Sequence, residues 1–233
     1  MEIIFKGRIF PNNILEGMDS KKCLNEFRIF IKNNDITITY VGENRNNIEE
    51  DAIALAQNTV KNISFESEQY VYFDFFDGVM KTHDDKHVTC KTLKCSYDIK
   101  QNVSKDHLDK GLDNLTIKNI ILDKAKNHYF ESLNCELDYE SRGSQLYKSF
   151  EEIKKVKNSL NVSETLIKET SKVFQKARHI EDEKIRIPGK FTKEEYNICK
   201  NVMKELIQRY MDFLNSEDIR KYKILEKSDF FAK

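Results

Sequence analysis

The sequence contains little glycine and proline and no tryptophan. Its seven glycines form no glycine-rich phosphate loop, and neither the GxSxG pattern of serine hydrolases nor the HExxH pattern of zinc proteases occurs. Nucleotide-binding folds that depend on closely spaced glycines are therefore disfavoured. One of the two prolines, Pro188, lies in a charged segment that also carries adjacent arginine and histidine residues.

The chain also lacks an excess of either charge. Lys and Arg number 39 and Asp and Glu also number 39, which argues against a bulk electrostatic binder of DNA. The five cysteines are an odd number without the spacing of a disulfide framework, so a reducing cytoplasm is the simplest location. No apolar run is long enough to span a membrane, and the first residues do not resemble a secretory signal.

Short β-rich segments dominate the first half of the chain. A turn at Asn33–Asp35 predicts a hairpin, and a helix is predicted from Asn47, with Glu50 completing a capping box. β-branched and aromatic residues cluster or alternate in five segments, 2–10, 26–33, 35–42, 69–81 and 86–99. We therefore predict a β-rich domain, residues 1–103, with one helix packed on it.

The second half has helical periodicity throughout. Apolar residues recur every three or four positions in five segments, 104–114, 115–140, 146–160, 163–177 and 192–213. Ser104, Ser163 and Thr192 are predicted N-caps, and Gly143 is predicted to interrupt the helical run. Residues 104–233 therefore predict an antiparallel bundle of about four helices, which makes the chain an α+β protein.

Two histidines and two cysteines lie close together near the end of the first half. His83, His87, Cys90 and Cys95 are ligand types that zinc accepts in a tetrahedral shell. However, zinc sites usually draw ligands from two separated segments, and an odd offset along a strand places Cys90 and Cys95 on opposite faces. A polar loop followed by a strand is the alternative interpretation, and we predict neither a metal nor a cofactor.

The adjacent Arg178 and His179 end the third predicted bundle helix. An arginine can hold a phosphate while an imidazole moves a proton, and cleavage through an RNA 2′-hydroxyl needs both functions. Arg186 and Lys190 follow and would widen a basic edge. The alternative is structural, because cations in the last turn of a helix complement its dipole and bond its free carbonyls.

A resemblance to a known family covers Leu115–Leu214. The stretch "FESLNCELDYESRGSQLYKSFEEIKKV", a capped helix ending "ARH", and "FTKEEYNICKNVMKELIQRYMDFL" resemble the helical HEPN-type domains of bacterial and archaeal defence proteins. The resemblance implies a metal-independent RNase that acts as a dimer through an Arg and a His several residues further on. This chain departs from that pattern, because Arg178 and His179 are adjacent and no histidine follows.

These observations predict a cytoplasmic, RNA-linked or defence-related protein without membrane association. In this interpretation Arg178 and His179 are the catalytic candidates of a non-canonical or inactive RNase, and Arg186 and Lys190 contact RNA. A homodimer through the helical half is a further expectation from the resemblance. The alternative is a non-catalytic binding or assembly module whose β-rich domain recognises a protein partner.

Overall fold

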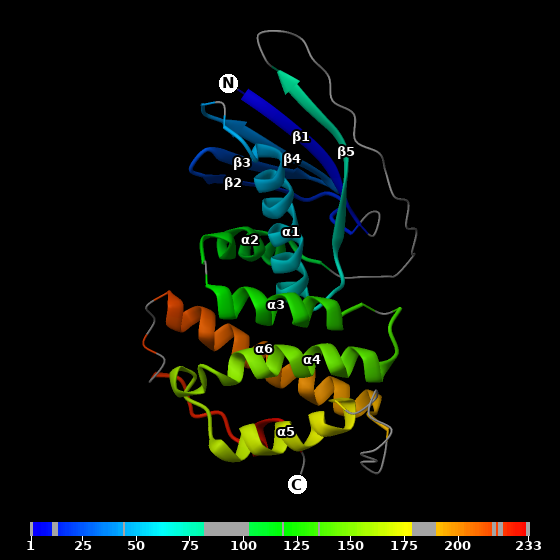
Figure 1. Ribbon diagram of the computed structural model, residues 1–233, viewed down its shortest axis with the longest axis vertical. Helices are drawn as coiled ribbons and strands as arrows, with labels where there is room; N and C mark the ends of the chain where they lie inside the picture. Colours follow the sequence, from blue (N-terminus) through cyan, green and yellow to red (C-terminus); the bar gives the residue numbers. More distant parts are fainter. Residues whose placement is uncertain are drawn as a thin grey trace. The chain divides into compact units, whose positions relative to one another are not determined.

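The computed structural model describes residues 2–10, 14–43, 45–81, 103–117, 119–134, 136–178, 190–215, 218 and 221–231, with backbone only at 74–81 and 178. The chain has the predicted α+β architecture and forms two compact units, Met1–Thr116 and Ile117–Lys233 (Figure 1). The helix predicted from Ser104 packs with the β-rich unit, so the first unit extends beyond the predicted boundary at residue 103.

The first unit is built on a five-stranded antiparallel sheet with the strand order β2-β3-β4-β1-β5. Its strands are β1 (Glu2–Phe10), β2 (Asp19–Leu24), β3 (Phe27–Lys32), β4 (Asp35–Val41) and β5 (Tyr72–Lys81). Four of these were predicted from alternation, and the predicted turn at Asn33 is confirmed by its left-handed backbone, with φ of 52°. The predicted segment 86–99 lies outside the described residues.

Strand β2 was not predicted, because its sequence DSKKCL carries almost no apolar residue. It lies at the edge of the sheet and pairs with β3 alone among the described strands. Two of its inward side chains meet polar partners on a helix: Ser20 Oγ donates to Asp109 Oδ1 (2.6 Å) and Lys22 Nζ donates to Asp113 Oδ1 (2.6 Å). The third, Leu24, packs against the hydrophobic core. These polar contacts replace the apolar alternation that a sequence pattern detects.

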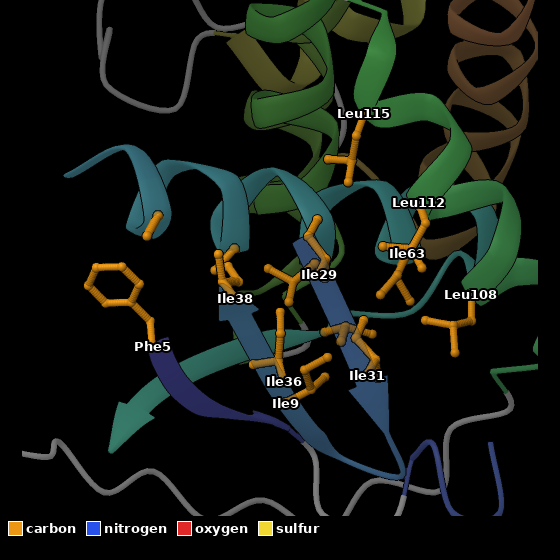
Figure 2. Packing of buried hydrophobic residues seen from close by; sticks show 14 of the residues in the cluster. Phe5, Ile9, Ile29, Ile31, Ile36, Ile38, Ile63, Leu108, Leu112 and Leu115 are labelled. Atoms are coloured by element: carbon orange, nitrogen blue, oxygen red, sulfur yellow. The ribbon is translucent and has the colours of Figure 1, made fainter. Parts of the chain in front are cut away.

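Two helices, α1 (Ile48–Ser67) and α2 (Lys105–Asp113), pack on one face of this sheet. Figure 2 shows aliphatic side chains of β3 and β4 pointing toward α1 and meeting Ile63, with Leu108 and Leu112 of α2 completing the core. The strand residues Ile29, Ile31, Ile36 and Ile38 are almost completely buried. Because side chains alternate along a strand, this burial places the residues between them on the opposite face.

The predicted capping box at the start of α1 is wrong. Asn47 has a left-handed backbone, with φ of 68° and ψ of 17°, and its side chain makes no capping hydrogen bond. A capping side chain needs an extended backbone at the N-cap to reach the free amides, and Asn47 does not have one. Asparagine here serves the turn, since it tolerates the left-handed region better than most residues.

The second unit contains α3 (Ile120–Ser132), α4 (Tyr139–Lys154), α5 (Glu164–Arg178) and α6 (Lys193–Leu214), with short 3-10 turns at Lys157–Ser159 and Lys227–Asp229. The caps at Ser163 and Thr192 are confirmed by hydrogen bonds from Leu166 N (3.2 Å) and Glu195 N (3.2 Å). The predicted break at Gly143 is wrong, because this glycine lies inside α4. No helix in the described ranges has the length and hydropathy of a membrane span.

The chain end packs onto the second unit through Arg209, which is only 4% exposed. Its Nη1 donates to Asn161 O (3.0 Å), and its guanidinium lies 5.4 Å from the centre of the Tyr222 ring. Tyr222 OH in turn donates to Asp212 Oδ2 (3.0 Å). These contacts hold the segment around Tyr222 against α6 and the loop before α5.

The close contact between α1 and α2 yields a stability prediction. A Cβ on Gly111 would lie 2.9 Å from both the Cγ1 and the backbone nitrogen of Ile63, so Gly111→Ala overpacks the helix pair. We expect a loss of about 1–3 kcal/mol in the free energy of unfolding, although alanine is the better helix former. Urea unfolding followed by circular dichroism measures this loss.

Lys110→Ala on the exposed side of α2 is the matched control, and it should change stability by no more than about 0.5 kcal/mol. A Gly111→Ala protein as stable as the wild type would show that α1 and α2 are not in close contact.

Candidate functional site

The structure places only part of the predicted site. Arg178 is the last residue of α5, and Lys190 is exposed shortly before the cap of α6. His179 and Arg186 lie outside the described residues, as do the zinc candidates His83, His87, Cys90 and Cys95. The described geometry therefore concerns the place where α5 ends and α6 begins, together with the part of α4 beneath it. We call this region the α5–α6 corner.

Gly143 of α4 brings together the two ends of the charged segment 178–190. A Cβ at this position would lie 2.5 Å from Phe191 Cε1 and 3.0 Å from Ala177 Cβ, so both residues pack directly on the glycine. Ala177 precedes Arg178, and Phe191 follows Lys190. The two ends of the segment 178–190 are therefore fixed on the same point of α4.

Two further contacts tie these ends to each other. The Phe191 ring stacks on Phe174 of α5 at 6.5 Å between centroids. The Glu195 carboxylate accepts from Lys176 Nζ of α5 (2.5 Å) and from the backbone amide of Thr192 (3.0 Å). One carboxylate thus links the last turn of α5 to the first turn of α6, and it also completes the capping box predicted at Thr192.

Arg142 places a fixed positive charge on the neighbouring position of α4. Its Nε donates to Ser132 O at the end of α3 (2.8 Å) and its Nη2 donates to Tyr196 OH (2.8 Å). The guanidinium carbon lies 4.1 Å from the centre of the Tyr196 ring and 5.3 Å from that of Tyr139. Within the described side chains no carboxylate forms an ion pair with Arg142, and its partners are aromatic faces and neutral oxygens.

Comparison with protein-family models, curated proteins and solved structures returns no match. The HEPN-like character of the helical unit therefore stays a prediction from the sequence. The roles of Arg178 and His179 stay predictions for the same reason.

Arg142 and Lys190 are two described cations at the corner. Arg142 is held rigid by neutral partners, and the backbone of Arg178 and the exposed Lys190 lie at either end of the same charged segment. Guanidinium and ammonium groups in such an arrangement suit phosphate oxygens. Within the described ranges, no three His, Cys, Asp or Glu side chains gather as a metal site.

Sequence reasoning missed Arg142, Gly143 and their partners. Arg142 was assigned no role from the sequence, and Gly143 was treated only as a helix breaker. One local signal was present, since Tyr139 and Arg142 lie three residues apart on one helix face. The contacts with Tyr196 and Phe191 come from distant parts of the chain and have no local signal.

Replacing Gly143 tests the frame of the corner. In Gly143→Ala the new methyl group meets the Phe191 ring, which is only 3% exposed and stacked on Phe174. We expect destabilisation by about 1–3 kcal/mol. Hydrogen exchange measured by mass spectrometry should accelerate in the last turn of α5 and the first turn of α6.

Ser144→Ala, at the next position of α4, is the control and should leave both quantities near those of the wild type. Unchanged exchange in Gly143→Ala would contradict the contact between Gly143, Ala177 and Phe191.

The thiol of Cys199 provides a separate test of the packing of α6. Burial, followed by the nearby Glu195 carboxylate, raises the pKa of this thiol far above its ordinary value. Since the thiolate is the reactive form, Cys199 should resist alkylation at pH 8 in the native protein, whereas the exposed Cys23 should react. Peptide mapping after iodoacetamide treatment measures both, and modification of native Cys199 at the rate of Cys23 would contradict its burial.

Proposed function

We propose that this protein binds RNA and that the α5–α6 corner contacts the RNA phosphates. The observation that carries the proposal is the packing of Ala177 and Phe191 on Gly143. This packing fixes both ends of the segment that carries Arg178, His179, Arg186 and Lys190. The segment 178–190 is mixed in charge, with four Lys and Arg and three Asp and Glu residues. With its ends anchored, it loses less conformational entropy on binding than a free segment does.

The four residues have distinct roles in this proposal. Arg178 holds a phosphate through its planar guanidinium, and Arg186 and Lys190 extend the basic edge on the same segment. His179 contacts the RNA beside Arg178 and serves as the proton carrier in a cleaving form of the protein. Arg142 supplies a rigid positive charge on α4, next to Gly143, supported by its bonds to Ser132 O and Tyr196 OH.

The near-zero net charge of the chain favours local contacts over bulk electrostatic attraction. RNA binding at the corner should therefore involve few phosphates and depend only moderately on salt. A small anchored patch can bind a few phosphates without an excess of basic residues in the whole chain.

The double variant Arg178→Gln/Lys190→Gln tests the corner. We expect it to weaken binding of a fluorescent single-stranded RNA about three- to thirtyfold in anisotropy titrations, because two phosphate contacts are lost. The slope of log K against log salt should fall by roughly 0.7 for each lost contact.

Lys172→Gln is the matched control, because Lys172 is an exposed α5 lysine already paired with Glu169 (2.8 Å). It should leave both affinity and slope unchanged. Equal binding by the double variant and the wild type would contradict the proposed contact. Absence of RNA binding by the wild-type protein would favour the assembly-module alternative.

Cleavage is tested by incubating the protein with RNA in EDTA and comparing the wild type with His179→Ala. Loss of metal-independent cleavage in the variant supports the catalytic form of the proposal. Binding without cleavage supports the non-catalytic form, and equal cleavage by both proteins excludes His179 as the proton carrier.

A further inference from the structure

One face of the N-terminal sheet, which neither α1 nor α2 covers among the described residues, carries an exposed aromatic side chain among cations. In β3, Ile29 and Ile31 are buried beneath the helices, so Arg28, Phe30 and Lys32 point to the opposite face. Phe30 is 44% exposed. An aromatic ring of this exposure on a sheet covered by helices on its other side contributes little to the core, and it is available to a ligand.

The strand register places Phe30 in the middle of a row of side chains. It lies opposite Lys21 of β2 and Thr37 of β4, and Thr37 lies opposite Lys6 of β1. Neighbouring strands are about 4.8 Å apart, so the row extends about 14 Å across the sheet. Arg28 flanks the row along β3. We call Lys6, Lys21, Arg28, Phe30 and Thr37 the open sheet face.

Nearby cations of the sheet form ion pairs with carboxylates, whereas two cations of the open sheet face do not among the described side chains. On the helix-covered side, Lys22 pairs with Asp113 (2.6 Å), and on the open side Arg8 pairs with Asp35 (3.7 Å). Among the described side chains, no carboxylate forms an ion pair with Lys21 or Arg28, although both are exposed strand residues. The two cations beside Phe30 are therefore available to an anionic ligand.

Besides Phe30, a pair of aromatic side chains lies on the same side of the sheet. Phe10 of β1 follows Arg8 and Lys6 on the outward side of the strand and stacks on Tyr72 of β5 at 5.4 Å between ring centroids. From the strand geometry, this pair is roughly 16 Å from Phe30. The sheet thus offers two aromatic positions with cations between them.

We propose that the open sheet face is a binding site for single-stranded RNA. An unpaired base stacks on the ring of Phe30, while Lys21 and Arg28 contact the phosphates on either side. Thr37 lies directly opposite Phe30 in the strand register. Its hydroxyl can exchange hydrogen bonds with a ribose 2′-hydroxyl, which favours RNA over DNA. Double-stranded RNA does not fit, because its bases are already stacked and a flat sheet cannot reach them.

This inference extends the proposed function to a second site, and the two can fail independently. The test uses the full chain and a fluorescein-labelled oligouridine in anisotropy titrations. We expect Phe30→Ala to weaken binding about 5- to 150-fold, as for loss of one stacked base, and Phe30→Tyr to stay within about twofold of the wild type. Phe30 is outside the core, and thermal unfolding verifies that each variant is folded.

Charge variants separate phosphate contact from stacking. Arg28→Gln should reduce the slope of log K against log salt by roughly 0.7, whereas Phe30→Ala should leave the slope unchanged. Lys110→Gln, an exposed lysine on α2 of the same unit, is the control and should change neither affinity nor slope. These slopes do not respond to a merely structural role of either residue.

The outcomes distinguish this inference from the α5–α6 corner. Weakened binding in Phe30→Ala supports the open sheet face, whatever the corner variants do. If Phe30→Ala binds RNA like the wild type while Arg178→Gln/Lys190→Gln binds it more weakly, the open sheet face is rejected as an RNA site. The α5–α6 corner is then retained as the RNA site. Equal affinity for a DNA of the same sequence or for the RNA duplex overturns the preference for single-stranded RNA, and preferential binding of an acidic peptide overturns RNA as the ligand.

Discussion

Burial of Ile29 and Ile31 beneath the helices is the interaction that fixes the first unit. Each buried isoleucine contributes about 1.5–3 kcal/mol relative to an exposed one, so a shift of β3 by one residue would expose both and bury two cations. The register therefore follows from the core. The same register brings Lys21, Arg28 and Phe30 together on the other face, and the proposed RNA site depends on the packing beneath it.

Much of the fold could be predicted from local patterns, and the exceptions have identifiable causes. Alternation located β1, β3 and β4, and the capping box at Thr192 located the start of α6, because these signals depend on neighbouring residues. Strand β2 was missed because two of its inward side chains bind aspartates of α2. The side chain of Asn47 was predicted to cap α1. It makes no capping hydrogen bond, because the turn gives Asn47 a left-handed backbone that local sequence does not reveal.

The candidate site could be predicted less completely than the fold. The sequence drew attention to Arg178 and His179, but the contacts that organise the corner join distant segments. Gly143 lowers helix propensity in any local reading, whereas in the structure it permits the approach of Phe191. The alternation of β3 predicts that Phe30 and Ile29 lie on opposite faces of the sheet. Which of the two is exposed depends on the face that the helices cover, and local sequence does not reveal that face.

The most direct test of the open sheet face uses the exposed thiol of Cys23. This residue of β2 lies directly opposite Arg28 of β3. Its alkylation rate in the full-length protein, followed by peptide mass spectrometry, should fall when saturating oligouridine is added, because the bound strand covers this part of the sheet. Double-stranded RNA of the same length should leave the rate unchanged. An alkylation rate of Cys23 unaffected by bound oligouridine would contradict the account.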